Sequence, residues 1–313
     1  MDLTASAVPA LDSGSRLTYW GLDHIGGDFT VSYAGNLPDS QYTKFAVNLR
    51  NKRTQGVSDR PYVSDQLLAK VKFRRNDVDE LSRLADIKQY YGGSRVHFPN
   101  FDTKPGFEVA SSGWPVRSPS GSEYLTTAWH TYKPTDPRVW TNIDYNNVLI
   151  GSVTSTATYS DTVFIRTDSS PFIFTGTYPD QSTSRWVAGW QGARAGDLVC
   201  TSGSFSYARC NVRVGTAAGW GVTNDYSGQA HGVNGSSVAS TDGAWISAKG
   251  DSGGPVFRYN NNQSNVSAYG MVSAGDRARV VSCPSWIPTT CYTAGVIALA
   301  QDIVLSNNIS FSW

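Results

Sequence analysis

The 313-residue chain lacks the features on which membrane-spanning and polyanion-binding proteins depend. Charged residues make up 16% of it, the net charge is +1 and no run rich in Lys or Arg occurs, so no nucleic-acid partner is expected. No apolar run approaches the roughly 18 residues of a membrane span, so no membrane partner is expected either. Met and long runs of Glu, Lys, Ala and Leu are scarce, whereas Gly, Ser, Thr, Tyr and Trp are abundant. This composition favours an all-β protein with many turns.

Cysteine is also scarce, and its four residues fall into two close pairs, Cys200 with Cys210 and Cys283 with Cys291. Neither pair has Cys-x-x-Cys spacing and no histidine lies nearby in the sequence, so a zinc site is disfavoured and no metal is expected. Two local disulfides in an oxidising compartment fit the spacing better, with four reduced buried thiols as the alternative.

The N-terminus, residues 1–6, lacks the charged and apolar regions of a signal peptide. This leaves either an intracellular protein or one whose signal peptide was removed before a start Met was added. Because the cysteine pairs favour an oxidising compartment, we expect a secreted, extracellular protein whose signal peptide is not present in this chain.

The density of charged residues divides the chain into two predicted units. Residues 1–91 contain 12 Lys or Arg and 11 Asp or Glu, whereas residues 92–313 contain 14 of each kind in more than twice the length. Strand-like alternation at 29–33 and 44–49, an apolar-rich run at 67–73 and a short amphipathic helix opening at Asn76 predict a small α+β domain over 1–91. Nothing in it suggests catalysis, and two histidines without evident partners are predicted to be structural, His24 and His97.

From residue 92 onward, short strand-like runs alternate with turn signals, which is typical of a β-sandwich or barrel. The runs include 106–109, 123–128, 147–153, 162–166, 198–200 and 268–273. Near the end the pattern changes, because apolar residues at helical spacing over 296–305 predict a C-terminal helix.

The string Gly250-Asp-Ser-Gly-Gly-Pro255 is the strongest chemical signal in the chain. A serine hydroxyl is a weak nucleophile by itself, so its surroundings must activate it. Flanking glycines allow a tight turn, and they leave the N–H groups of Gly250 and Ser252 available to an oxyanion. The alternative is a glycine-rich β-turn with an incidental serine. The string predicts a nucleophilic Ser252, provided that a histidine and an acid lie near it in space.

The order of residues along the chain decides between two arrangements of a serine hydrolase. Ser252 also fits Gly-x-Ser-x-Gly, the nucleophile elbow of α/β-hydrolases, in which the histidine follows the serine. All four histidines precede Ser252, namely His24, His97, His130 and His231. The elbow is therefore excluded, whereas the order His, Asp, Ser remains possible.

His130 and Asp161 are the predicted partners of Ser252. His130 lies where the run 123–128 gives way to a turn, and a general base must stand at the edge of a rigid element. Asp161 opens the apolar run 162–166, where a partly buried carboxylate can hold one imidazole nitrogen and fix the tautomer. Three rival acids lie in polar turns or after the strand and are disfavoured, Asp136, Asp144 and Asp168.

Several segments beyond residue 91 resemble the chymotrypsin-fold serine proteases, and specifically the bacterial branch of streptogrisins and α-lytic protease. Residues 127–130, Thr-Ala-Trp-His, are similar to that family's Thr-Ala-Gly-His, and residues 250–255 match its nucleophile motif. The segment bearing Asp161, the loop between Cys200 and Cys210, the strand at 270–275 and the C-terminal helix also resemble parts of the family.

The resemblance implies a fold and a set of roles. The expected fold is all-β, with two six-stranded antiparallel β-barrels, a C-terminal helix and a small α+β domain in front. The catalytic triad would be His130, Asp161 and Ser252, in the cleft between the barrels, with Gly250 and Ser252 as the oxyanion hole. Protein or peptide substrates would bind to the backbone of Ser273, Ala274 and Gly275, and Ser273 would also touch Asp161. No cofactor is implied, and we expect a monomer.

Residues 1–91 bear a vaguer resemblance to the pro-region that such enzymes carry, a small α+β domain that helps the protease fold and blocks its cleft until it is cleaved. The resemblance implies a zymogen whose N-terminal segment is an intramolecular inhibitor or chaperone. Cleavage near Tyr90–Gly93 would then yield the mature enzyme, residues 92–313.

The chain departs from the family at two cysteines and one arginine. Thr131 and Ala248 stand where the family usually has cysteines, so Cys283 is expected to pair with Cys291. Thr201 stands where the bacterial branch often has the arginine that neutralises the acid before the nucleophile. That acid is Asp251 here, and a buried carboxylate needs a partner. Three arginines are the candidates, Arg194, Arg209 and Arg277.

The sequence therefore predicts a serine endopeptidase that hydrolyses peptide bonds through an acyl-enzyme. Trypsin-like enzymes carry a carboxylate six residues before the nucleophile, where this chain has Ile246, so an apolar or small side chain is expected at the cleaved position, P1. The alternatives are a catalytically silent binding module of the same fold and a proenzyme whose cleft is blocked by residues 1–91. A carbohydrate-binding β protein is a further alternative, suggested by ten Trp and sixteen Tyr.

Overall fold

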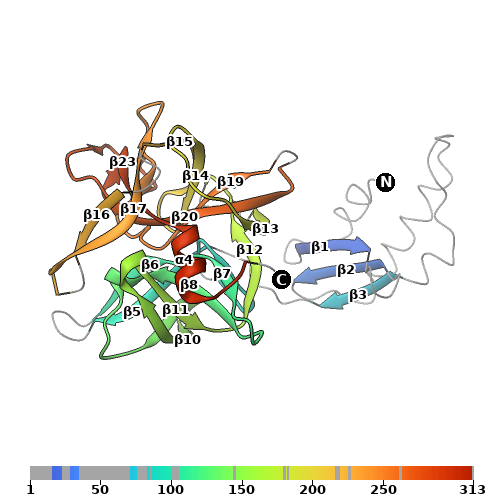
Figure 1. Cartoon of the computed structure of the whole chain (residues 1–313). Coiled ribbons are helices and arrows are strands. Elements are labelled where there is room, and N and C mark those ends of the chain that lie inside the picture. The colour runs from blue at the N-terminus through green and yellow to red at the C-terminus, as the bar shows by residue number, and fades with distance from the viewer. Residues whose placement is uncertain are drawn as a thin grey trace. The chain divides into compact units, whose positions relative to one another are not determined.

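The structure is a computed structural model in which two compact units divide the chain between Glu80 and Leu81 (Figure 1). In the second unit it describes residues 83–84, 86–100, 106–143, 146–178, 181, 183–215, 219–224, 227–260 and 263–311. In the first it describes the backbone of three strands.

These three strands form one sheet in the order β1-β2-β3, from β1 (Arg16–Leu22), β2 (Phe29–Ala34) and β3 (Val71–Arg75). β1 pairs antiparallel with β2, and β2 pairs parallel with β3. The strand expected at 29–33 is thus present, and β3 overlaps the apolar-rich run at 67–73. The strand expected at 44–49, most of the helix expected from Asn76, and His24 lie outside the described residues.

The unit boundary lies eleven residues before the one inferred from charge density, so residues 81–91 group with the second unit. At the end of this stretch β4 (Tyr90–Gly92) pairs parallel with β12 (Ser169–Phe174) and forms one edge of the ten-stranded sheet. Tyr90 and Gly92 are buried there.

A seven-stranded sheet builds the first barrel of the second unit in the order β6-β5-β9-β10-β11-β8-β7. All of its pairings are antiparallel. Alternation along the strands directs one face inward, where a core includes Val96, Leu125 and Ile165. The strands are β5 (Arg95–Asn100), β6 (Gly106–Ser111), β7 (Pro115–Arg117), β8 (Glu123–Ala128), β9 (Arg138–Ile143), β10 (Asn146–Ala157) and β11 (Thr162–Arg166).

A ten-stranded sheet forms the second half, in which β23 pairs with both β17 and β20. Most pairings in this sheet are antiparallel. The parallel pairs are β13 with β20 and β4 with β12. A separate small sheet, β18-β22-β21, borders the nucleophile segment. The strands are β13 (Ser184–Trp190), β14 (Leu198–Gly203), β15 (Tyr207–Val214), β16 (Gly219–Asn224), β17 (Ala230–Ser240), β18 (Ser247–Ala248), β19 (Pro255–Tyr259), β20 (Asn265–Gly275), β21 (Val280–Val281), β22 (Cys291–Tyr292) and β23 (Ala294–Leu299).

The predicted C-terminal helix is present as α4 (Ala300–Asn307), but it begins four residues later than expected. Val296 and Ile297 belong to β23, because β-branched residues paired between β17 and β20 satisfy a sheet as well as a helical pattern. Ala300 and Ile303 of α4 pack into the core around Trp114, whose indole N–H donates to the carbonyl oxygen of Gly270 at 2.7 Å.

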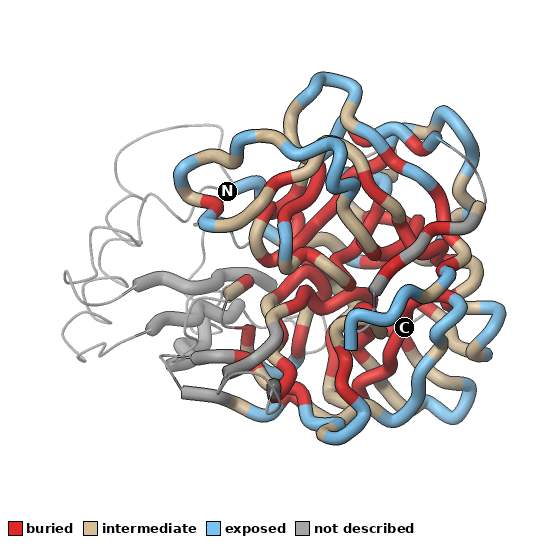
Figure 2. The backbone as a smooth tube through the Cα atoms, turned by 90° about the vertical axis from the view of Figure 1, so that its left-hand side faces the viewer, coloured by how far each residue is buried: buried red, intermediate tan, exposed pale blue. Residues whose placement is uncertain are grey.

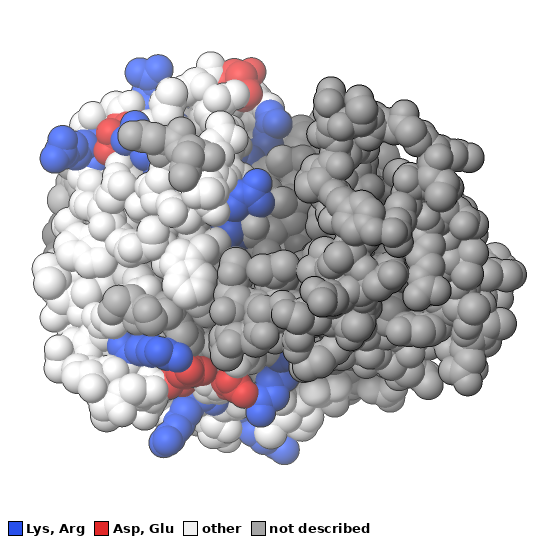
Figure 3. Space-filling model, turned by 90° about the vertical axis from the view of Figure 1, so that its right-hand side faces the viewer, with Lys and Arg blue, Asp and Glu red and all other residues white. Residues whose placement is uncertain are grey.

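The predicted all-β, two-barrel fold with a C-terminal helix is confirmed, and Figure 2 shows buried residues gathered in the interior and exposed residues at the periphery. Cys200 is bonded to Cys210 and Cys283 to Cys291, the pairs proposed from spacing. On the face shown in Figure 3, acidic and basic side chains lie close to one another among many uncharged ones. None of the helices in the described part of the chain is long and apolar enough to cross a membrane.

Candidate active site

Pairing of β8 with β11 places the predicted base and acid side by side. His130 lies in the short helix η2 (Trp129–Thr131), which directly follows β8, and Asp161 caps η3 (Thr158–Ser160) before β11. Ala128 is paired with Thr162, so the two strand ends meet. The N–H of Trp129 donates to the Asp161 carbonyl at 3.0 Å, and the Thr131 hydroxyl donates to the Ala128 carbonyl at 2.8 Å. The backbone around His130 is thereby held on both sides.

The side chains of His130, Asp161 and Ser252 form one continuous hydrogen-bonded chain. His130 Nδ1 lies 2.8 Å from Asp161 Oδ2, and His130 Nε2 lies 2.9 Å from Ser252 Oγ. Asp161 Oδ1 accepts the backbone N–H of His130 at 3.0 Å, which fixes the carboxylate relative to the ring. A carboxylate at Nδ1 keeps the proton of the neutral imidazole on that nitrogen, so Nε2 is free to accept the serine proton.

Ser273 is the third donor to this carboxylate, as the sequence suggested. Its hydroxyl donates to Asp161 Oδ2 at 2.5 Å, and Asp161 is only 1% exposed. Three donors therefore surround a carboxylate that water does not reach, which fixes its orientation.

The pKa of His130 is raised above its ordinary value. Burial of the ring acts against the charged form, but the negative charge of Asp161 and its hydrogen bond to the ring outweigh burial. The imidazole is consequently a stronger base than a free histidine and can take a proton from Ser252.

The nucleophile turn has the backbone conformation that its glycines predict. Gly250 has φ +102° and Gly253 has φ +89°, which non-glycine residues rarely adopt. The N–H of Asp251 donates to the Ala248 carbonyl at 3.0 Å. Among the described residues, nothing accepts a hydrogen bond from the N–H groups of Gly250 and Ser252, so both remain available to an oxyanion.

Ser111 of the first barrel clamps this turn, a role that no sequence pattern indicated. Its N–H donates to the Ser252 carbonyl at 2.9 Å and its hydroxyl lies 3.1 Å from the Gly250 carbonyl. The Ser111 hydroxyl also accepts the N–H of Ser204 at 2.8 Å. No local pattern marks a serine at the end of a strand as such a clamp, because its partners lie more than ninety residues away.

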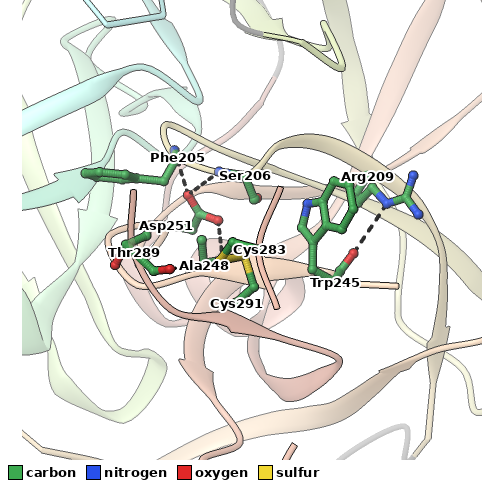
Figure 4. The surroundings of a disulfide bond; sticks show 9 residues. All are labelled: Phe205, Ser206, Arg209, Trp245, Ala248, Asp251, Cys283, Thr289 and Cys291. Carbon is green, nitrogen blue, oxygen red and sulfur yellow. Dashed lines mark hydrogen bonds between the residues drawn. A yellow bond between two sulfur atoms is a disulfide. The ribbon is translucent and has the colours of Figure 1, made fainter. Parts of the chain in front are cut away.

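The prediction that Arg194, Arg209 or Arg277 partners Asp251 is wrong. Asp251 is 0% exposed, and its carboxylate accepts the backbone N–H groups of Phe205, Ser206 and Ala248 at 2.9, 3.2 and 2.6 Å (Figure 4). Arg209 instead donates to the Trp245 carbonyl, while Arg194 and Arg277 are exposed. The turn at 203–206 wraps the carboxylate, so its amide dipoles replace a direct ion pair.

A cleft of about 1360 Å³ opens beside the three side chains and is lined by His130, Ser252 and all three predicted substrate-binding residues, Ser273, Ala274 and Gly275. β20 pairs with β23 on one side of this stretch, whereas its pairing with β19 ends at Met271. Among the described strands nothing pairs with the other side of residues 273–275. That edge can accept an extended chain as an added strand.

Ile246 does not line the cleft, contrary to its expected position at the pocket floor. It is 2% exposed and belongs to the core with Val212 and Val256. The cleft wall near it is formed by the next residue, Ser247, and by Thr290 and Val296.

The remaining candidates lie away from the triad or are not described. Asp136 forms an ion pair with Arg138, Asp168 pairs with Lys88, and Asp144 lies outside the described residues. The other two histidines that the structure describes take no part in the triad. Burial lowers the pKa of His97 to about 4, so that the His97 ring is neutral. The His231 ring packs edge-on against Trp129, with ring centroids 4.7 Å apart. In the described part of the chain, no three His, Cys, Asp or Glu residues are grouped as metal ligands.

No protein-family model matches the chain, and a search of curated proteins finds no significant match. Solved structures of bacterial chymotrypsin-fold serine proteases do match. The Nocardiopsis protease shares 18% identity over 68% of this chain and 94% of its own, with a TM-score of 0.45. Protease A of Thermobifida fusca shares 19% identity over 70% and 96%, with a TM-score of 0.46. A glutamic-acid-specific serine protease shares 19% identity over 70% and 98%, with a TM-score of 0.49. At such identity the chemistry has to be argued from this chain's own residues.

Proposed function

We propose that the protein is a serine endopeptidase that hydrolyses peptide bonds through an acyl-enzyme. The observation that carries the proposal is the chain of contacts from Asp161 Oδ2 through His130 to Ser252 Oγ, at 2.8 and 2.9 Å. A base within hydrogen-bond reach of a serine, itself oriented by a buried carboxylate, is the arrangement that nucleophilic catalysis requires.

His130 removes the proton of Ser252 as the hydroxyl oxygen attacks the scissile carbonyl, and Asp161 stabilises the resulting imidazolium. The N–H groups of Gly250 and Ser252 bind the oxyanion of the tetrahedral intermediate. His130 then gives its proton to the leaving amine. Water, activated by the same imidazole, hydrolyses the acyl-enzyme and restores Ser252.

The substrate is a protein or peptide that binds in extended form along residues 273–275. The unpaired side of β20 supports this assignment, since it offers backbone groups to an added strand. We assign a non-basic P1 preference for an apolar or small side chain. Ser247, Thr290 and Val296 support it, because none of these wall residues carries a charge, and the carboxylate of Asp276, which also lines the cleft, accepts the N–H of Ala278 in its own turn.

The proposal includes the compartment and the oligomeric state. Because two disulfides fit an oxidising compartment, the enzyme is assigned to the extracellular space. It is assigned as a monomer. The N-terminal unit is assigned as its zymogen segment, an intramolecular inhibitor or chaperone.

The test is digestion of a mixed peptide library, followed by mass spectrometry of the new termini. We expect cleavage by the wild type after apolar or small residues, and none by Ser252→Ala. Preferred cleavage after Lys or Arg would refute the P1 assignment but keep the protease. No cleavage by the wild type, with both disulfides formed, would favour a silent binding module. Cleavage that begins only after limited proteolysis would identify a proenzyme.

A further inference from the structure

Arg83 is buried in the catalytic unit although it precedes the first barrel in the sequence. It is 2% exposed, and its guanidinium donates to the carbonyls of Gly203 and Gly176 at 2.7 and 3.2 Å. The charge also lies over the rings of Tyr207 and Phe174, at 5.2 and 5.7 Å from their centroids. A buried cation is costly unless it is paired, so these contacts indicate a specific role.

The carbonyl that Arg83 binds belongs to the turn that holds Asp251. A Cβ on Gly203 would lie 2.1 Å from Asp251 Cγ, so the carboxylate packs directly on this glycine. Phe205 and Ser206, in the same turn, donate their N–H groups to Asp251 Oδ1. Arg83 therefore faces the buried carboxylate across the Gly203 peptide group. The attraction of Asp251 opposes the loss of charge that burial imposes on Arg83.

A second arginine supports the same turn. The guanidinium of Arg95 lies 4.3 Å from the Phe205 ring centroid; burial lowers the pKa of Arg95, and Asp251 opposes part of that shift. The backbone N–H of Arg95 donates to the Arg83 carbonyl at 2.7 Å. Two cations from residues 83–95 thus compensate the single negative charge of Asp251, which lies directly before the nucleophile.

The lead-in segment, here defined as residues 83–84 and 86–94, packs inside the catalytic unit and not only on its surface. Asp86 is fully buried and accepts the N–H groups of Ile87 and Tyr91 at 3.0 and 2.7 Å. Ser94 exchanges hydrogen bonds with Ser112, next to the clamp residue Ser111. Gly92 leaves no room even for a Cβ, which would meet the Gly113 carbonyl at 2.1 Å.

We propose that Arg83 is a positioning residue for the oxyanion loop, and that the lead-in segment stays with the catalytic unit as a permanent part of it. Arg83 holds the turn 203–206, which holds the Asp251 side chain, which in turn fixes the peptide groups of Gly250 and Ser252. The catalytic consequence rests on the proposed protease function. Cleavage that releases the N-terminal unit occurs before Arg83, because the peptide bonds of 90–93 are buried in β4 and the turn after it.

The test uses the full chain and four variants. Arg83→Ala removes the guanidinium and leaves space, Arg83→Met removes the charge and the N–H donors to Gly203 and Gly176 but fills much of the space, and Arg83→Lys retains a charge. Lys88→Ala is the matched control, since it removes an exposed cation from the same segment. Ser252 is titrated with a fluorophosphonate, and hydrogen exchange is measured for peptides covering 203–206 and 248–252.

We expect Ser252 to be labelled about 10²-fold more slowly in Arg83→Ala and Arg83→Met than in the wild type. This is the size of the rate loss caused by removal of one oxyanion-hole donor. The rate of backbone hydrogen exchange at 203–206 and 248–252 rises in both variants. In Arg83→Lys the labelling and exchange rates are intermediate, and in Lys88→Ala they equal those of the wild type. Guanidinium ion at low, non-denaturing concentration restores labelling of Arg83→Ala, whereas urea, which has the same shape without the charge, does not. The labelled enzyme has an N-terminus at or before Arg83.

Wild-type labelling and exchange in Arg83→Met would overturn the inference, as would equal rescue by urea or a labelled enzyme that starts at Gly92 or Gly93. If Arg83→Ala does not fold, Arg83→Met and Arg83→Lys decide through the same readouts. If the wild type is labelled neither before nor after limited proteolysis, the proposed function fails. The exchange comparison still decides whether Arg83 anchors the Asp251 turn, because it requires no catalysis.

Discussion

Replacement of Asp161 by Asn tests how the base is held. The carboxylate of Asp161 accepts three donors, two on Oδ2 from His130 Nδ1 and Ser273 Oγ and one on Oδ1 from the His130 N–H. An amide of the same shape can keep the Oδ1 contact, but its NH₂ group then faces two donors. The ring avoids the clash by moving its proton to Nε2, and that nitrogen can no longer accept a proton from Ser252.

The expected loss of kcat/KM for Asp161→Asn is about 10⁴-fold at neutral pH, which corresponds to about 5.4 kcal/mol of transition-state stabilisation. The folded structure should be retained, because side-chain volume and the Oδ1 contact are preserved.

The pH profile gives a second, independent readout. His130 must be neutral to act as a base, so activity falls as the pH drops through its pKa. In the wild type that pKa is raised, because Asp161 outweighs burial. In Asp161→Asn only burial remains, and burial lowers the pKa of an imidazole. The acidic limb of kcat/KM should therefore move to lower pH in the variant.

The assay is ester or peptide hydrolysis from pH 4 to 10. Ser273→Ala serves as the comparison variant, because it removes one hydrogen-bond donor to Asp161 and leaves the Asp161 carboxylate in place. A variant that retains more than a tenth of the activity, or an acidic limb that stays in place, would refute the account of the triad.

Three further predictions follow from other contacts. Gly253→Ala should abolish most activity, since its Cβ would lie 2.3 Å from Thr127 Oγ1 and 2.5 Å from the Ser111 carbonyl. The control is Gly121→Ala, which has a similar φ of +83° but lies in open space. Equal effects of the two substitutions on the labelling of Ser252 and on the melting temperature would contradict the steric argument. Trp114→Phe removes the indole N–H that donates to the Gly270 carbonyl and should cost about 1–3 kcal/mol in urea unfolding; an unchanged midpoint would show that the bond adds no stability. Burial raises the pKa of Asp86 to about 8, against 3.8 when unfolded, so this group stabilises the fold fully below pH 3.8 and the contribution is lost as the pH rises through 8. The free energy of unfolding should therefore depend less on pH between 4 and 8 in Asp86→Asn, and parallel curves would contradict this.

The sequence predicted the residues of the candidate site where their neighbours in the chain determine the geometry. Ser252 lies in a glycine-rich turn, and His130 and Asp161 lie at strand ends that pair across β8 and β11. Local patterns of this kind can be read from a single sequence.

Features that depend on tertiary contacts were not predicted. Val296 and Ile297 fit a helix and a buried strand equally well, and only pairing with β17 and β20 decides for the strand. Arg83 and Gly203 are 120 residues apart, so the sequence did not indicate that Arg83 lies near the turn that holds Asp251, and three other arginines were predicted as its partners. Charge density located the unit boundary only coarsely, because residues 81–91 are charged like the first unit but pack in the second.

The central claim is that His130 activates Ser252 as a nucleophile. The most direct measurement is covalent labelling by a fluorophosphonate, with the modified residue identified by mass spectrometry. The account predicts stoichiometric labelling of Ser252 in the disulfide-bonded wild type, and labelling at least about 10³-fold slower in His130→Ala. Labelling of another residue, or equal rates in the two proteins, would contradict it.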